Sequence, residues 1–318
     1  MIKLSKISTK PPKGAKKKDF KKKTKEIVKE IAELQERMTA EGKHSLLVIF
    51  QGMDSSGKDG ASRNVFSRCS PTGVSATSFK KPTDEEFAHD FLWRIHKQMP
   101  EKGQIKIFNR SQYEDILIQW VHGWISDEKA HRRMASINAL EELVQYDNNT
   151  TVLKFYMHLS QERQQEKLQE RIDDPEKNWK HNDNDWKESK YWNDYRRCYE
   201  YAINNSSIAW NIAPVDARWY RDYFIASKVL ETLKGMNIVL PVLKEKPKVG
   251  RKTAAAKKTT AKIKKIPAAK KAVAKKRMAK KAVAKKAAAR TVRKKPAVKK
   301  AVAKKVTARR TTRKKAKK

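Results

Sequence analysis

Residues 46 to 61 read LLVIFQGMDSSGKDGA and join a short apolar run to a glycine-rich turn that ends in lysine. Such a run, bounded by polar and glycine residues, is typical of a strand buried on both faces of a parallel sheet. Gly52, Gly57 and Lys58 then follow the G-x-x-x-x-G-K spacing of a Walker A loop. A loop of this kind offers backbone N–H groups, a helix dipole and a lysine to phosphate oxygens. The stretch therefore predicts a phosphate site at the end of a buried strand.

Two carboxylates accompany this loop: Asp54 lies within it, and Asp59 stands where a serine or threonine usually follows the lysine. A carboxylate beside phosphates is repelled by an energy on the order of several kcal/mol at low effective dielectric. A Mg²⁺ ion removes this repulsion, because it binds one or two carboxylates together with phosphate oxygens. Asp54 is therefore predicted to bind Mg²⁺ or, alternatively, to orient an attacking phosphate oxygen. Asp59 is expected to point along the following helix and to stabilise its N-terminal dipole.

Apolar runs and helical patterns alternate along the chain on both sides of this loop. The alternation predicts an α/β fold with a parallel sheet. The expected strands are residues 45–50, 104–108, 151–159 and 209–215. The expected helices are residues 26–41, 58–69, 84–98, a long region over about 113–145, a segment capped by Ser160, and 217–234.

Charge divides the 318 residues into three parts. The chain carries a formal charge of +40, yet residues 26–250 hold 33 basic and 34 acidic residues. The excess lies in residues 1–25, with 11 lysines and one aspartate, and in residues 251–318, with 31 lysines or arginines and no acid. This distribution predicts a flexible basic arm at 1–25, one folded domain at 26–243, and a disordered tail rich in lysine and alanine at 244–318.

Residues 172–199 are dense in charge, tryptophan and tyrosine, and we expect about this range to form a lid over the phosphate site. Cys69 and Cys198 are too few for a disulfide framework and are expected to be reduced thiols. No apolar run of 18 residues and no secretion signal is found in the sequence. A cytoplasmic protein that does not enter a membrane is therefore expected.

The loop GMDSSGKDG, residues 52–60, resembles that of the type 2 polyphosphate kinase family. Further stretches resemble the same family in the same order along residues 40–235. They are FKKPTDEE (79–86), FLWRIH (91–96), FNRSQYED (108–115), RIDDPEKNWK (171–180), YWNDYRRCYEYAI (191–203) and AWNIAPVDARWY (209–220).

The resemblance implies a three-layer P-loop kinase fold similar to thymidylate kinase, in which a parallel sheet lies between helices and a helical lid covers the site. It implies reversible phosphoryl transfer between inorganic polyphosphate and nucleotides with Mg²⁺, in a homo-oligomer, either a dimer or a tetramer. Asn109 replaces the aspartate of many members, and the pattern NRS-x-YED is similar to a subgroup that accepts AMP as well as ADP. ADP, AMP and the product ATP are therefore the expected nucleotides.

The resemblance also assigns roles to residues, and phosphoryl transfer explains them, because it depends on positioning and charge neutralisation. The implied catalytic residues are Asp54, Lys58, Asn109, Arg110 and Glu114. The implied phosphate-binding residues are Gly52, Ser55, Ser56, Gly57, Lys58, Lys80, Arg94, Arg171, Lys177 and Lys180. The implied metal ligands are Asp54 and Asp174. For Arg94 and Arg110, an alternative role in salt bridges stays open.

Two other functions are consistent with parts of the sequence. The tail resembles those of linker histones, which predicts a salt-dependent nucleic-acid binder. Such a tail can equally hold polyphosphate, DNA or RNA without reading sequence, or dock the enzyme on the nucleoid. The third hypothesis is an ATP-dependent nucleoside monophosphate kinase, which would have the same fold.

Overall fold

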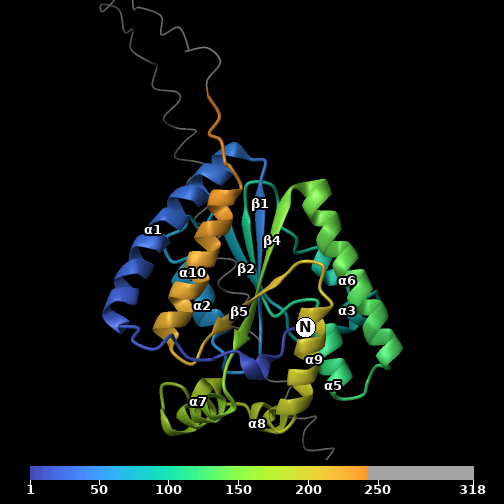
Figure 1. The fold of residues 1–318 in the computed structure, drawn as a ribbon. Helices are drawn as coiled ribbons and strands as arrows, with labels where there is room; N and C mark the ends of the chain where they lie inside the picture. The colour runs from blue at the N-terminus through green and yellow to red at the C-terminus, as the bar shows by residue number, and fades with distance from the viewer. Residues whose placement is uncertain (243–318) are drawn as a thin grey trace, which may run out of the picture. The chain divides into compact units, whose positions relative to one another are not determined.

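A computed structural model of the chain describes residues 1–242, and residues 243–318, which include the predicted tail, lie outside the described residues. The described part contains one five-stranded parallel sheet in the order β2-β3-β1-β4-β5 (Figure 1). The strands are β1 (Ser45–Gln51), β2 (Val74–Ser78), β3 (Ile105–Asn109), β4 (Thr150–His158) and β5 (Trp210–Pro214). The predicted α/β class with a parallel sheet is confirmed.

The central strand β1 is buried along its whole length, as the apolar run predicts. Its side chains alternate between the two faces of the sheet, because successive residues of a strand point in opposite directions. Leu46, Val48 and Phe50 enter one core, and Leu47 and Ile49 enter the other. Both faces of the sheet must therefore be covered by helices.

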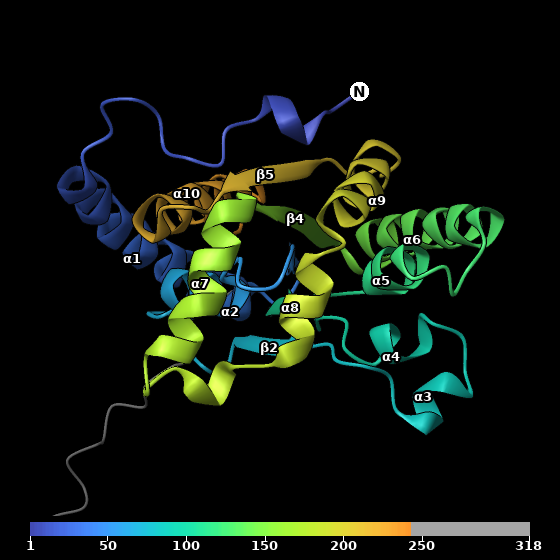
Figure 2. The same cartoon turned by 90° about the horizontal axis from the view of Figure 1, so that it is seen from below.

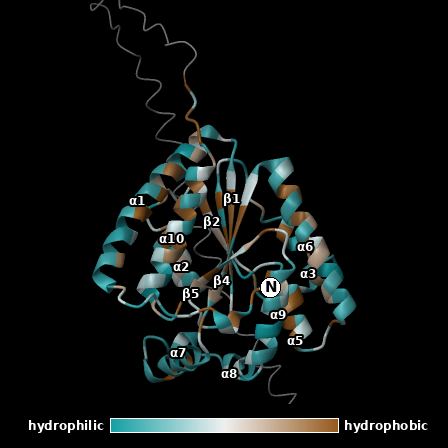
Figure 3. Cartoon of the chain, viewed as in Figure 1, coloured by the Kyte–Doolittle hydropathy of each residue, from teal (hydrophilic) through white to brown (hydrophobic). Residues whose placement is uncertain are grey.

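Three helices cover the first face: α1 (Lys17–Glu41), α2 (Lys58–Val65) and α10 (Arg218–Gly235). Another three cover the second: α5 (Glu114–Val121), α6 (Asp127–Asn148) and α9 (Trp192–Asn204). Figure 1 shows the two groups on opposite sides of the sheet. Figure 3 shows that hydrophobic residues gather on the strands and that the outer helix surfaces are mostly hydrophilic. The result is a three-layer arrangement.

The remaining helices lie around the carboxyl ends of the strands and their connections. Helix α7 (Gln161–Asp173) and helix α8 (Asp183–Ser189) lie below the sheet in Figure 1 and cross its carboxyl end in Figure 2. The Ser160 side chain accepts the Arg163 N–H at 3.2 Å, so the predicted cap of α7 is confirmed. The short elements are η1 (Leu4–Lys6), α3 (Asp84–Phe87), α4 (Trp93–His96) and η2 (Asn178–Lys180).

The structure differs from the expectation of a flexible arm at residues 1–25. Residues 1–10 form a strap across the carboxyl ends of β4 and β5, visible along one edge in Figure 2. The side chain of Leu4 is fully buried in the second core, and its N–H donates to Glu200 at 2.7 Å. Helix α1 begins nine residues earlier than predicted, because Phe20 packs edge-on against Tyr223 with ring centroids 4.7 Å apart. Lysine-rich composition concealed these few apolar anchors.

Three further elements differ from the predicted ones. Strand β2 was not predicted, because VSATS is short and four of its five side chains are small, without the long apolar run of a central strand. The single helix expected at 84–98 is the two short helices α3 and α4. The expected lid at 172–199 includes the start of α9, whose Tyr195, Cys198 and Tyr199 belong to the core. The part of this range outside the core therefore ends near residue 191.

Among residues 1–242, we found no helix with the length and apolar character needed to cross a membrane.

Replacement of Leu4 by alanine tests whether the strap belongs to the folded domain. Because Leu4 is fully buried, we expect Leu4→Ala to lower the free energy of unfolding by about 2–5 kcal/mol in urea titration. Ile2→Ala is the matched control, since Ile2 is 36% exposed, and it should change stability by about 0.5 kcal/mol or less. Equal effects of the two substitutions would contradict the packed strap.

Candidate active site

The phosphate loop connects the end of β1 to the start of α2, as the sequence predicts. Two of its glycines are required by the geometry. A Cβ at Gly52 would lie 2.9 Å from the Cβ of Met157. Gly57 has φ +87°, and a Cβ there would lie 2.3 Å from Nη1 of Arg221. A larger residue at Gly52 would displace the loop from the sheet, and one at Gly57 would be strained by the left-handed backbone and would have to move the Arg221 side chain.

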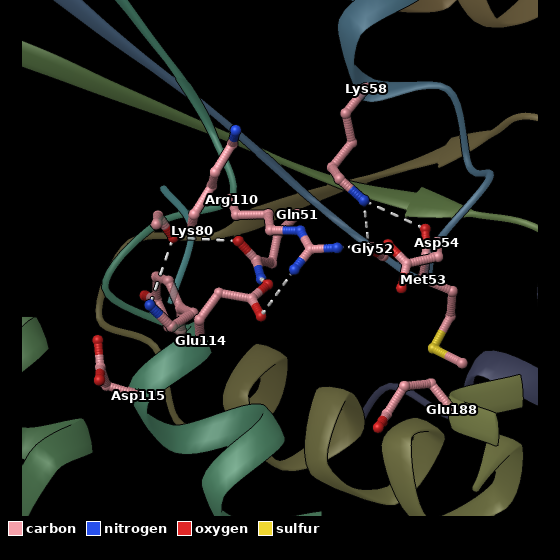
Figure 4. Close-up of polar contacts among 12 residues, drawn as sticks. Gln51, Gly52, Met53, Asp54, Lys58, Lys80, Arg110, Glu114, Asp115 and Glu188 are labelled. Atoms are coloured by element: carbon pink, nitrogen blue, oxygen red, sulfur yellow. Dashed lines mark hydrogen bonds and ion pairs between the residues drawn. The ribbon is translucent and has the colours of Figure 1, made fainter. Parts of the chain in front are cut away.

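Lys58, the first residue of α2, folds back over this loop. Its Nζ donates to the carbonyl of Gly52 at 2.7 Å and to that of Met53 at 3.2 Å (Figure 4). Burial lowers the pKa of Lys58, and the neighbouring charge of Arg110 lowers it further. The ammonium thus lies against the loop backbone, where a bound phosphate group would replace the two carbonyls as its partner.

Arg110 lies between two carboxylates. Its guanidinium pairs with Asp54 from the loop and with Glu114 from α5, the latter at 3.8 Å (Figure 4). Glu114 in turn accepts a hydrogen bond from the Gln51 amide at 2.5 Å. Arg110 has φ +62°, in the left-handed region that non-glycine residues seldom adopt. The paired carboxylates raise the pKa of Arg110, the charge of Glu114 first and that of Asp54 next. The strand end, the loop and the helix start are thus joined by one cation.

Asp54 is the acid of the loop, and its side chain is 25% exposed. Burial raises the pKa of Asp54, but the charges of Arg110, Lys58 and Arg171 act in the opposite direction, and the pKa lies below its ordinary value. Asp54 is therefore ionised at neutral pH. Because a cation already compensates its charge, the carboxylate can lie in a site for a polyanion.

Asn109 and Asp59 form a second polar contact beside the loop. The Asn109 amide donates to the Asp59 carboxylate at 3.0 Å. Asp59 lies in the first turn of α2, as expected from its position after Lys58. The other amide atom of Asn109, Oδ1, is buried without a hydrogen-bond partner among the described residues. Asn109 thus has an acceptor to spare at the carboxyl end of β3.

The donor set fits a Mg²⁺ ion that is shared with the substrate. Among residues 1–242, no group of three or more histidine, cysteine, aspartate or glutamate side chains is placed to hold a metal. Mg²⁺ does not need one, since one or two carboxylates and substrate phosphates are its usual ligands. Asp54 satisfies this requirement. Asp174 instead pairs with Lys177 at 2.8 Å, and no hydrogen bond or ion pair within residues 1–242 joins it to Asp54.

Lys80 and Arg94 occupy different environments, although both were predicted to bind phosphate. The side chain of Lys80 is exposed, and its carbonyl accepts from Arg94 at 2.8 Å. Arg94 is only 7% exposed and pairs with Asp115 at 3.2 Å and with Glu86 at 3.6 Å. Arg94 therefore has the salt-bridge environment that was the alternative, and it supports the segment that carries Lys80. The role of Lys80 in phosphate binding stays a prediction.

The predicted basic residues of the lid also separate into two groups. Arg171 reaches the loop and donates to the Ser55 hydroxyl at 2.8 Å, while pairing with Asp185 of α8 at 2.5 Å. Lys177 pairs with Asp174, and the ammonium of Lys180 lies 4.8 Å from the ring centroid of Trp179. Arg171 is therefore at the site in this structure, and the two lysines are on the outer part of the lid.

Sequence reasoning missed three residues that contact the loop. They are Gln164 and Lys167 of α7, and Arg221 of α10. The first two could have been found, because they precede Arg171 by seven and four residues and so share its face of a helix. Arg221 offered no such signal, because its contact joins residues 164 positions apart.

Replacement of Arg94 by methionine tests its structural role. Removing one partner of a buried ion pair leaves Asp115 without compensation, so Arg94→Met should lower the free energy of unfolding by about 3–5 kcal/mol. Lys80→Met is the control, and its exposed side chain should change stability by about 0.5 kcal/mol or less. Urea unfolding measures both. Similar stability of the two variants would show that Arg94 is not held by these acids.

Comparison with known proteins relates this geometry to a family. The model of the polyphosphate kinase 2 family matches residues 14–241. An AMP/ADP-polyphosphate phosphotransferase from Meiothermus ruber is 41% identical over 214 residues, which are 66% of this chain and 80% of that protein. An ADP-polyphosphate phosphotransferase from Rhodopseudomonas palustris is 37% identical over 229 residues, 67% of this chain and 79% of that protein.

A solved structure agrees with these matches. The crystal structure of a polyphosphate kinase 2 from Arthrobacter aurescens TC1 superposes with a TM-score of 0.74 at 37% sequence identity, covering 77% of this chain and 89% of that one. The residues matched by the family model include the sheet, the phosphate loop, α7 and α8. The chain belongs to the polyphosphate kinase 2 family.

Proposed function

We propose that the protein transfers phosphoryl groups from inorganic polyphosphate to ADP and AMP, with Mg²⁺. The observation that carries the proposal is the ion pair between Asp54 of the phosphate loop and Arg110 at the end of β3, with Lys58 beside it. The names of the relatives from Meiothermus ruber and Rhodopseudomonas palustris supply the substrate classes. The pattern NRS-x-YED favours AMP as a second acceptor beside ADP.

The residues of the site divide the work of phosphoryl transfer, which depends on positioning and on charge stabilisation. The backbone of the loop and Lys58 bind the phosphates at the end of the substrate that carries the transferred group. Arg110 stabilises negative charge on the phosphoryl group during transfer, and Glu114 holds Arg110 in place. Arg171 adds a positive charge from the lid side of the loop. The hydrogen bond from Asn109 to Asp59 holds the start of α2 beside the end of β3.

Asp54 would hold the Mg²⁺ ion together with substrate phosphate oxygens. When bound, the ion neutralises negative charge on the phosphates and helps to orient them. Asp54 itself stays ionised because its pKa is lowered, and its contact with Arg110 fixes the carboxylate at the loop. Asp174 would join this site only if the lid moved from the conformation described here.

The test measures luminescent ATP formation from ADP, polyphosphate and Mg²⁺ by the full chain of 318 residues. We expect activity in the natural protein and a loss of about 10²–10³-fold in kcat for Lys58→Met. Asp54→Asn should lose a similar factor and should require more Mg²⁺ for its remaining activity. Unchanged melting temperatures would separate these losses from unfolding.

The controls address the rival function. An ATP-dependent nucleoside monophosphate kinase would convert AMP with ATP and would ignore polyphosphate. A folded protein that behaves in this way would overturn the choice of polyphosphate as donor. A fully active Asp54→Asn variant would overturn the role of Asp54 alone.

The basic tail supports a second proposal, that residues 251–318 hold polyanions near the enzyme. The 31 cationic and no acidic side chains there would release counterions on binding, which makes affinity strongly salt-dependent. We expect truncation after residue 242 to flatten the salt dependence of polyphosphate binding, measured by fluorescence anisotropy from about 50 to 200 mM salt. An unchanged slope would assign the salt dependence to the folded domain. Dimer or tetramer formation and docking on the nucleoid remain predictions, which sedimentation of the full chain and its localisation in cells would test.

A further inference from the structure

The outer surface of the phosphate loop is held by one face of helix α7. Gln164 donates to the carbonyl of Asp54 at 3.2 Å, and Lys167 donates to the carbonyl of Ser55 at 3.2 Å. Arg171, one turn further along, donates to the Ser55 hydroxyl at 2.8 Å. The spacing of three and four residues places these donors on the same side of the helix.

These contacts fix the direction of peptide groups in the loop. In a trans peptide the C=O and the N–H point in opposite directions. A carbonyl of Asp54 that faces α7 therefore turns the N–H of Ser55 away from α7. Arg221 has the same effect from α10, since it donates to the carbonyl of Gly57 at 3.1 Å and so turns the N–H of Lys58 away. The N–H groups of Ser55 and Lys58 therefore point away from these donors, and the N–H of Ser56 donates to the Met53 carbonyl at 3.2 Å within the turn.

Ser55 is the residue of the loop that most needs such support. Its φ is +65°, a left-handed conformation that a serine does not readily keep by itself. Both its carbonyl and its hydroxyl are bound by α7, through Lys167 and Arg171. The helix therefore stabilises the backbone conformation of the loop at its most strained position.

Lys167 is an unusual residue for a buried position. It is 8% exposed, and the charged groups that face it are Arg163 of its own helix, Arg218 and Arg221 of α10, and Asp216 before α10. Three of these four are cations, and no carboxylate of the described residues lies within ion-pair distance of its ammonium. Burial lowers the pKa of Lys167 to about 8, and the arginines contribute. A cation in this setting does not stabilise the fold, because it is desolvated without a counter-charge.

We infer that Lys167 is a positioning residue for phosphoryl transfer, which acts by holding the Ser55 carbonyl so that the phosphate loop keeps its anion-binding conformation. The inference rests on the proposed function. Lys167 lies on α7 and is not part of the Walker A pattern. It acts on the substrate indirectly, through the backbone of the loop. Two consequences distinguish Lys167 from a residue that only packs. Its loss should lower activity without lowering stability, and an arginine at this position should preserve activity.

The experiment compares Lys167→Met, Lys167→Arg and the control Lys228→Met, in which the lysine is exposed on α10 and pairs with Glu231. We expect Lys167→Met to lower kcat by about 10²-fold, the effect of a small displacement of reacting groups, with less change in the KM for ADP. Its melting temperature should be equal to that of the natural protein or higher, since a buried charge has been removed. Lys167→Arg should keep most of the activity, and Lys228→Met should keep all of it.

The pH profile supplies an independent readout. The Lys167 ammonium is a full donor below its pKa and a weaker, neutral donor above it, so kcat of the natural protein should fall as pH rises through about 8. At pH 9 the fall should reach up to about tenfold, which is the loss of the protonated fraction. An arginine stays charged in this range. The alkaline fall in kcat of Lys167→Arg should therefore lie at higher pH than that of the natural protein. Lys58 is present in both proteins and so does not account for the difference between them.

The outcomes separate the two proposals. No polyphosphate-dependent ATP formation by the natural protein would overturn the proposed function. An active natural protein with Lys167→Met within about twofold of it would overturn the positioning role. The role would also be overturned if Lys167→Arg were as impaired as Lys167→Met while both melt at the natural temperature, or if Lys167→Arg kept the alkaline limb near pH 8.

Discussion

The structure depends on one electrostatic constraint: a loop that attracts a polyanion also contains a carboxylate. Asp54 can lie there because Arg110 and Lys58 compensate its charge, and burial would otherwise favour its protonated form. The compensation needs three separate elements to meet, namely the end of β1, the end of β3 and the start of α5, where Glu114 holds Arg110 from the other side. The left-handed backbone at Arg110 is part of the same arrangement, because it is located where β3 must turn to bring the guanidinium to the loop.

The sheet explains why these elements can meet. Strand β1 lies between β3 and β4, and the carboxyl ends of neighbouring strands in such a sheet are where α/β proteins bind their ligands. The phosphate loop, Arg110 and the lid helix α7 each follow directly after one of these three strands. Burial of β1 on both faces fixes its register, so the loop after it has little freedom at its first residue. Ser55 lies further from the strand and has a left-handed backbone, and α7 contacts both its carbonyl and its hydroxyl.

Prediction from the sequence succeeded where a short local pattern determines the structure. The buried strand, the glycine loop with its lysine and the Ser160 cap are local signals, and the structure confirms each of them. Strand β2 and the strap were missed, because VSATS lacks an apolar run and because lysines outnumber the one buried leucine of the strap. The family resemblance predicts that Arg94 binds phosphate, with a salt-bridge role as the alternative. Its burial between Asp115 and Glu86 depends on contacts between distant segments, which no spacing in the sequence reveals.

The strap is connected to the phosphate site through the lid helix. Thr9 of the strap donates to Asp216 at 2.6 Å, and Asp216 also accepts the N–H of Ser160 at 2.9 Å. Ser160 caps α7, the helix whose side chains hold the loop carbonyls. Asp216, which follows β5, therefore holds the N-cap residue of α7 against the sheet. Gln164 and Lys167 lie in the first two turns of α7, so this anchor helps to position the side chains that contact the loop carbonyls. Arg171, near the other end of the helix, adds its contact with the Ser55 hydroxyl, so α7 supports the loop along most of its length.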